Sequence, residues 1–179
     1  MNYLDVTNVK IDLGAGADKR PGYLGVDQLD LPGVDIVCNL SEGIPLQDNS
    51  VEAVSSSHFL EHIADTVGLM EEIYRVCKPN ALVEIKVPYF TSIGAFKDPT
   101  HVSFFTERTW EYFDVSYTDS KRLPSYLLKC NFKLEHVAYI WHRRWYRFLP
   151  FKRTLLLPHF WNIAKTMYVR LRVIKNVDE

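Results

Sequence analysis

Residues 9–16 read Val-Lys-Ile-Asp-Leu-Gly-Ala-Gly, a short and mostly apolar stretch that runs directly into two glycines. The pattern predicts a β-strand over Val9–Leu13 and a tight loop after it, because glycine lets the backbone turn and lets a ligand approach closely. A second strand, expected over Tyr23–Val26, ends at Asp27, whose carboxylate can accept hydrogen bonds from both hydroxyls of a ribose. These residues favour a ribose-bearing ligand, and a purely structural glycine turn is the alternative.

The glycine loop differs from two common phosphate-binding loops. A dinucleotide fingerprint has a third glycine where this chain has Lys19, and it places its acid roughly 20 residues further on. Here Asp27 follows Gly16 by only 11 residues, which disfavours NAD and FAD. The sequence contains no GxxxxGK[ST] motif, so a Walker-type phosphate loop is excluded.

Asp12 is an acidic residue inside this otherwise apolar strand. A buried carboxylate is unfavourable unless hydrogen-bond donors surround it. The backbone N–H groups of the following glycine loop are in a position to supply them. We therefore expect Asp12 to take part in forming the ligand site.

Seven predicted strands alternate with helices or short crossovers along the chain. Besides the first two, strands are expected over residues 34–38, 51–57, 81–87, 132–140 and 168–174. Helices are expected over residues 63–77, 106–117 and 125–130. The first helix follows from an apolar stripe at steps of four and three, formed by Ile63, Val67, Met70, Tyr74 and Cys77, with Pro79 expected to stop it. This order predicts an α/β fold on a mostly parallel, doubly wound sheet, which binds ligands at the carboxyl ends of its strands.

Composition places the chain among globular proteins. Of its 179 residues, 47% are hydrophobic and 24% are charged, which excludes the fibrous and disordered classes. Residues 1–179 are expected to form one domain. The three cysteines include no CxxC pair, and the sequence shows neither a signal-type N-terminus nor a run of apolar residues long enough for a transmembrane segment. We therefore expect a cytoplasmic protein with reduced thiols.

The net charge of −1 conceals a strong asymmetry. Residues 1–140 carry 12 Lys and Arg against 20 Asp and Glu, whereas residues 141–179 carry 9 against 2. Residues 141–160, which we call the basic aromatic segment, hold five basic residues, six aromatic residues and no acid. Three interpretations are open: a lid packed on the domain, a contact with a membrane surface or a lipid-linked substrate, and a less favoured contact with nucleic acid.

Four segments, in the same order, resemble the class I S-adenosylmethionine-dependent methyltransferases, and in particular their methyltransferase type 11 branch. They are Ile11-Asp12-Leu13-Gly14-Ala15-Gly16, Gly25-Val26-Asp27, residues 44–54 (IPLQDNSVEAV) and residues 75–81 (RVCKPNA). The last two are similar to the family's LPF-x-DNSFD-x-V and RVLKPGG. The resemblance covers roughly residues 9–140. It implies a Rossmann-like, seven-stranded sheet that is mostly parallel and has an antiparallel C-terminal strand, with the basic aromatic segment as an insertion between the last two strands.

The resemblance also implies the cofactor, S-adenosyl-L-methionine, and the residues that bind it. The cofactor-binding residues carried over are Asp12, Gly14, Ala15, Gly16, Asp27, Asn39, Leu40 and Ser57. In this assignment the glycine loop packs against the methionine part, Asp27 holds the ribose, and Asn39 and Leu40 flank the adenine. The chain departs from the family in two places. Asn39 stands where an acid is usual, and the stretch from Gly16 to Tyr23 is short, which implies a truncated first crossover and a more open cofactor edge.

Two histidines are candidates for a catalytic base. Methyl transfer to a hydroxyl requires positioning and the removal of a proton, and imidazole suits the second task. His58 directly follows the strand over residues 51–57, where the resemblance places it beside the sulfonium. His101 lies in the loop after the strand over residues 81–87, and this loop should face the same pocket. A hydrogen-bonded structural histidine is the alternative for each, and His62 beside Glu61 is expected to be structural.

Residues 58–62 also match H-x-x-E-H, a zinc-peptidase pattern. Two histidines four residues apart on a helix can bind zinc, with the glutamate as a base. The match is only five residues long, it indicates no third ligand, and His58 is expected to precede the helix. We therefore predict no metal site and keep a zinc peptidase as a minor alternative.

The sequence thus predicts an enzyme that transfers a methyl group from S-adenosyl-L-methionine to a small-molecule or saccharide acceptor, at a hydroxyl oxygen. The acceptor class follows from the size of the domain, which leaves no room for a large separate recognition module. The alternative from a different class is a non-catalytic binding module that retains the cofactor fold and acts through the basic aromatic segment.

Overall fold

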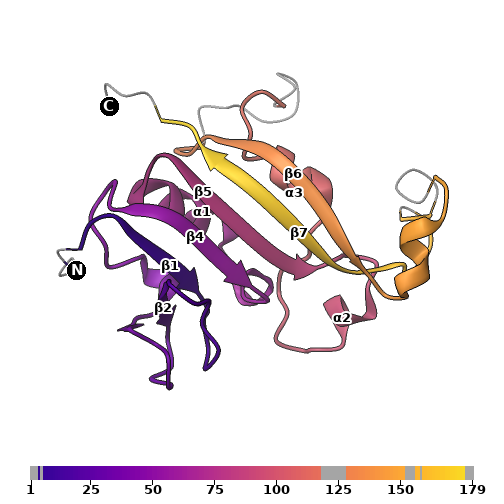
Figure 1. Cartoon of the computed structure of the whole chain (residues 1–179), viewed down its shortest axis with the longest axis horizontal. Helices are drawn as coiled ribbons and strands as arrows, with labels where there is room; N and C mark the ends of the chain where they lie inside the picture. Colours follow the sequence, from indigo (N-terminus) through magenta and orange to yellow (C-terminus); the bar gives the residue numbers. More distant parts are fainter. Residues whose placement is uncertain (1–3, 5, 118–127, 152–155, 158, 176–179) are drawn as a thin grey trace.

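A seven-stranded sheet forms the centre of the molecule (Figure 1). The computed structural model describes residues 4, 6–117, 128–151, 156–157 and 159–175. In this part of the chain the strand order is β3-β2-β1-β4-β5-β7-β6. The strands are β1 (Val9–Leu13), β2 (Leu24–Asp27), β3 (Ile36–Val37), β4 (Val51–Ser57), β5 (Cys77–Pro88), β6 (Phe132–Trp141) and β7 (Ala164–Val173).

The strand directions agree with the prediction. β1 pairs in parallel with β2 and with β4, β2 pairs in parallel with β3, and β4 with β5. β7 runs antiparallel to both β5 and β6. The predicted fold class, a Rossmann-like and mostly parallel sheet with an antiparallel C-terminal strand, is confirmed. The carboxyl ends of β1, β2 and β4 consequently meet at one edge of the sheet, where α/β proteins bind ligands.

The helical segments lie in the connections between strands. They include α1 (Thr66–Val76), α2 (Ile93–Phe96) and α3 (Glu107–Glu111), and the single 3-10 turns η1 (Leu40–Glu42), η2 (Leu60–His62) and η4 (Arg144–Phe148). None of the helices within the described ranges has the length and apolar character needed to cross a membrane. The predicted truncation of the first crossover is confirmed, because residues 14–23 form turns and no helix.

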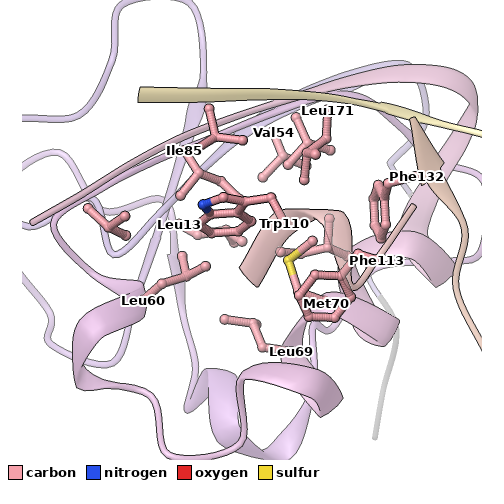
Figure 2. Close-up of a cluster of buried hydrophobic side chains, with 14 of the residues drawn as sticks. Leu13, Val54, Leu60, Leu69, Met70, Ile85, Trp110, Phe113, Phe132 and Leu171 are labelled. Carbon is pink, nitrogen blue, oxygen red and sulfur yellow. The ribbon is translucent and has the colours of Figure 1, made fainter. Parts of the chain in front are cut away.

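One face of the sheet forms the hydrophobic core together with α1 and α3 (Figure 2). Trp110 of α3 is fully buried and stacks on Phe105, with ring centroids 5.4 Å apart. Figure 2 shows Trp110 beside Leu13 and Ile85 of the sheet, with Met70 of α1 on its other side. Burial of this apolar surface is the main stabilising contribution to the fold.

The opposite face of the sheet is polar, because alternate residues of each strand point to it. In register across four neighbouring strands it carries Asp12, Ser55, Glu84 and Arg170. Glu84 accepts hydrogen bonds from Arg20 (2.6 Å), from Arg170 (3.0 Å) and from the Tyr168 hydroxyl. Burial raises the pKa of the Glu84 carboxyl, but these hydrogen bonds outweigh it and hold the pKa at about 2. Hydrogen bonds from its neighbours therefore stabilise the ionised carboxylate of Glu84 on this face.

α1 begins later than predicted, and its buried face departs from the predicted apolar stripe at Val67. Asp65 caps the helix by accepting a hydrogen bond from Gly68 N (2.8 Å). The buried residues are Leu69, Met70, Ile73 and Val76. Val67, which belongs to the predicted apolar stripe, is 37% exposed. Pro79 does not stop the helix, since the chain has already entered β5 at Cys77.

The other predicted elements that differ are shorter or longer than their patterns indicate. α3 ends at residue 111 and not at 117, because the chain after it turns to meet β6, where the Phe113 carbonyl accepts a hydrogen bond from Phe132 N (2.9 Å). β3 has two residues where five are predicted, and β7 begins at residue 164 and not at 168. Of the helix predicted over residues 125–130, residues 125–127 lie outside the described residues and 128–130 are not helical.

Candidate active site

The loop after β1 requires glycine at both of its turns. Gly14 and Gly16 have backbone φ angles of 66° and 54°, in the left-handed region that residues with a Cβ rarely adopt. A Cβ atom on Gly14 would lie 2.3 Å from Cγ of Phe59, so no side chain fits there. Gly14 N donates a hydrogen bond to the Val26 carbonyl (2.8 Å), which joins the loop to β2. The loop thus presents bare backbone at the carboxyl ends of β1 and β2.

Asp27, at the end of β2, is oriented by two backbone hydrogen bonds. Its Oδ2 accepts from Gly16 N (3.0 Å) and its Oδ1 accepts from Leu29 N (3.0 Å). An ionised carboxylate has about four acceptor sites, so each oxygen can accept a further hydrogen bond. The glycine loop therefore fixes the direction of the Asp27 carboxylate and leaves it able to bind two hydroxyls.

A cavity of about 380 Å³ opens beside these residues, and we call it the cofactor pocket. The predicted site residues that line it are Gly14, Asp27, Asn39, Leu40 and His58. Five further lining residues were not predicted as site residues, namely Gln28, Ser41, Phe59, His62 and Ile63. Ala15 and Gly16 belong to the same glycine loop but do not line the cavity.

Asn39 has a structural role besides its place in the pocket. Its Oδ1 accepts a hydrogen bond from Ser41 N (3.1 Å), and its Nδ2 donates to Oε1 of Glu42 (2.8 Å). The side chain therefore caps η1. An amide oxygen has two lone pairs, so one remains for a ligand.

Asp12 and Ser57 line a different cavity, of about 450 Å³, on the polar face of the sheet. Their place follows from strand alternation, which directs the Asp12 side chain to the face opposite the core. Oδ2 of Asp12 accepts a hydrogen bond from Arg20 N (2.8 Å), so a backbone donor satisfies the buried carboxylate as expected. The donor comes from the crossover and not from the glycines. Asp12 supports this crossover from outside the cofactor pocket.

His58 lines the cofactor pocket, and 49% of its side chain is exposed. Its φ angle of 56° turns the chain between β4 and η2, so the helical arrangement of an H-x-x-E-H zinc peptidase is not formed. Nδ1 of His58 lies 3.2 Å from Oε1 of Glu61, whose side chain is only 2% exposed. A carboxylate oxygen accepts, so Nδ1 carries the proton and Nε2 presents a lone pair.

His101 comes from the loop between α2 and α3 and lies beside His62, with ring centroids 4.8 Å apart. Val102 N and Ser103 N both donate to the Glu61 carbonyl, at 2.8 Å and 3.1 Å, and tie this loop to η2. The structure thus brings both predicted catalytic histidines to Glu61. The sequence analysis names Glu61 and His62 in the H-x-x-E-H match but does not place either of them among the predicted site residues.

Comparison with known proteins agrees with this architecture. Residues 4–85 match a family described as a methyltransferase domain. YcgJ from Bacillus subtilis is 14% identical, with a TM-score of 0.60 over 96% of this chain and 94% of that chain. An S-adenosylmethionine-dependent methyltransferase from Archaeoglobus fulgidus is 15% identical, with a TM-score of 0.60 over 95% and 88%. One from Mesorhizobium loti is 13% identical, with a TM-score of 0.59 over 95% and 93%. No curated protein sequence matches the chain.

At such low identity the solved structures establish the fold, and the family match establishes the domain type. Residues 4–85 carry a methyltransferase domain, and the chain has the fold of solved S-adenosylmethionine-dependent methyltransferases. The resemblance, the enzyme class and the cofactor predicted from the sequence are confirmed.

Replacing Gly14 by alanine is expected to destabilise the protein more than replacing Gly22. Both glycines have positive φ angles, of 66° and 78°, but a Cβ at Gly22 would meet nothing within 4 Å. Gly22→Ala should therefore lower the free energy of unfolding by about 1 kcal/mol through backbone strain alone. Gly14→Ala adds the contact with Phe59 and should lower it by roughly 1–3 kcal/mol more. Chemical denaturation of both variants measures the difference, and equal losses would show that Phe59 does not constrain the loop.

Proposed function

We propose that this methyltransferase acts on a hydroxyl oxygen of a small-molecule or saccharide acceptor. The observation that supports the proposal is the pair formed by His58 and Glu61, which places an oriented imidazole at the cofactor pocket. A hydroxyl acceptor must lose a proton when its oxygen is methylated. A histidine oriented by a carboxylate is suited to take that proton.

The proposed cofactor site consists of the glycine loop with Ala15 and Gly16, Asp27, and the residues of η1. Gly14 lines the pocket, and Asp27 retains acceptors for two ribose hydroxyls. Leu40 and Ile63 supply buried apolar surface, which suits an adenine ring. We assign Asp12 and Ser57 a supporting place, behind the loop and next to His58. When bound, S-adenosylmethionine supplies an electrophilic methyl group.

His58 acts as the base through Nε2. Oε1 of Glu61 lies 3.2 Å from Nδ1 and accepts its hydrogen bond. This carboxylate stabilises the imidazolium that forms when Nε2 takes up a proton. His101, the other predicted base, has its Nδ1 only 2.9 Å from the Ala95 carbonyl and does not line the cofactor pocket, so we assign the base to His58.

We further propose that residues 1–179 act as a single domain in the cytoplasm. Cys38, Cys77 and Cys130 are all free thiols, which is typical of proteins in a reducing compartment. The basic aromatic segment lies between β6 and β7, in keeping with an insertion into this domain.

Asp27→Asn is expected to weaken the binding of S-adenosylhomocysteine. The substitution removes the negative charge and one of the two acceptor oxygens at the predicted ribose site. Hydrogen bonds to a charged group contribute about 1.5–3 kcal/mol, so the dissociation constant should rise about 10-fold to 150-fold. Isothermal titration calorimetry measures it, with Asp30→Asn as the control, since Asp30 is exposed in the same loop. Undiminished affinity in Asp27→Asn would remove Asp27 from the site.

His58→Gln is expected to lower kcat by about 10²-fold to 10⁴-fold, the usual contribution of a positioned base. Affinity for S-adenosylhomocysteine should stay within about threefold of the wild type. Formation of S-adenosylhomocysteine with a panel of monosaccharides and simple phenols measures turnover, and His136→Gln, which changes an exposed histidine on β6, is the control. Unchanged turnover in His58→Gln would refute the proposed base. Cofactor binding by the wild type without turnover on any acceptor would favour the non-catalytic binding module.

The basic aromatic segment supports a second proposal, a contact with an anionic membrane surface or a lipid-linked acceptor. Trp145, Phe148 and Phe151 are 58%, 72% and 76% exposed, which argues against a lid that buries them. Arg143 and Arg144 beside them are exposed as well. Aromatic side chains interleaved with basic ones suit the interface of a bilayer.

Exposed aromatic surface continues from this segment toward the candidate active site. Trp161 lies next to Phe96 of α2, with ring centroids 5.5 Å apart. Phe96 in turn stacks on Phe104, at 4.7 Å, three residues after His101. A lipid anchor resting on these rings would hold an attached acceptor close to His58 and His101.

Vesicle sedimentation tests the membrane contact. The protein is expected to bind phosphatidylcholine vesicles that contain phosphatidylserine, less at moderate than at low salt, because its arginines meet the anionic headgroups. Replacing Trp145 and Phe148 by serine should weaken binding about tenfold through lost apolar contact. Tyr117→Ser, which changes a 56% exposed aromatic outside the segment, should have no effect. Equal sedimentation of all three proteins would refute the contact.

A further inference from the structure

Glu61, His62 and His101 form a compact cluster of metal-ligand types beside the cofactor pocket. One carboxylate oxygen of Glu61 and one ring nitrogen of each histidine lie within 4.8 Å of one another. Glu61 and His62 belong to η2, whereas His101 comes from a loop about forty residues further along the chain. The hydrogen bonds from Val102 N and Ser103 N to the Glu61 carbonyl hold the two segments together.

The Glu61 carboxylate has an oxygen that the fold leaves unsatisfied. Oε1 faces His58, but Oε2 is buried and has no hydrogen-bond partner among the described residues. A buried carboxylate oxygen without a partner is strongly unfavourable in a folded protein. Its presence therefore points to a ligand that completes the site.

The hydrogen bonds of both imidazoles leave their other nitrogens suited to a metal ion. Nδ1 of His101 lies 2.9 Å from the Ala95 carbonyl, and Nδ1 of His62 lies 3.0 Å from the Thr100 hydroxyl and 3.3 Å from the Thr100 carbonyl. A carbonyl oxygen only accepts, so in each ring Nδ1 donates and Nε2 is left for a ligand. Nε2 of His101 lies 3.9 Å from Oδ2 of Asp98, which is beyond hydrogen-bond distance. Metal-binding histidines are usually held in this way, with the second nitrogen donating to a carbonyl or carboxylate.

We propose that Glu61, His62 and His101 bind one divalent ion of the zinc class. Two imidazoles and one carboxylate form a known three-residue set for such ions, and it leaves at least one coordination position open. Ligand atoms around tetrahedral zinc lie about 3.4 Å apart, so the three side chains close by an ångström or so on binding. His62 is exposed and can make this movement.

The place of the site suggests what the ion does. His62 lines the cofactor pocket, so the open coordination position lies where an acceptor would enter. A zinc-class ion binds a hydroxyl oxygen and makes its proton easier to remove. This role rests on the proposed function, whereas the binding of the ion does not. The site also revises the expectation of no metal, since the third ligand, His101, lies outside the H-x-x-E-H motif.

Titration of chelator-treated protein with Zn²⁺, against a zinc-binding dye, tests the proposal. The wild type should bind one equivalent at sub-micromolar concentration. Glu61→Gln, His62→Gln and His101→Gln should each weaken binding by about 100-fold or more, because the loss of even a residue that orients a ligand costs 10-fold to 100-fold. Two controls should bind as the wild type does: His136→Gln, which alters an exposed histidine on β6, and Cys38→Ser, which removes a partly accessible thiol.

Thermal unfolding separates lost ligation from misfolding. His62→Gln changes an exposed side chain, so its metal-free midpoint should match that of the wild type, while added Zn²⁺ should raise only the wild-type midpoint. Zinc binding weaker than millimolar, or binding that the three substitutions leave unchanged, would overturn the proposal. Calorimetry with S-adenosylhomocysteine on metal-free protein reports on the cofactor site independently, so a failure of the proposed function and a failure of the metal site are distinguishable.

Discussion

Parallel pairing of β1 with both β2 and β4 is the constraint on which the site depends. It brings the carboxyl ends of three strands to one edge of the sheet. At this edge lie the glycine loop after β1, Asp27 at the end of β2 and His58 after β4. The left-handed turns at Gly14 and Gly16 then allow Gly16 N to reach the Asp27 carboxylate. A change in the β1–β2 register would separate these groups, although none of them would have changed chemically.

Glu61 links this edge to the loop that carries His101. Its backbone carbonyl accepts two hydrogen bonds from that loop, and its carboxylate faces His58 on one side. One buried residue thus positions a candidate base and contributes to a candidate metal site. In the proposed assignment the two roles are compatible, because they use different oxygens of the same carboxylate.

The sequence predicts features that depend on neighbouring residues better than those that depend on packing. β1 and β4 have the predicted bounds, since a short apolar run between turn residues is a local signal. The predicted stripe of α1 is confirmed at Met70 and wrong at Val67, because the packing of the helix on the sheet covers Leu69 and leaves Val67 exposed. The meeting of Glu61 with His101 could not be predicted, because no local pattern relates residues so far apart. Asp12 was recognised as unusual, but the face to which it points is set by the pairing of β1.

The polar face of the sheet limits which changes of sequence this protein can accept during evolution. Glu84 points to the polar face and Ile85, its neighbour, lies in the core, and the same two-residue alternation holds in register along the paired parts of β5 and β7. Deleting one residue within β5 would exchange these faces for every residue beyond it, placing a carboxylate in the core and a leucine or isoleucine in water. The central strands can therefore accept substitutions one at a time, whereas changes in length are confined to the connections, of which the one between β6 and β7 is an example.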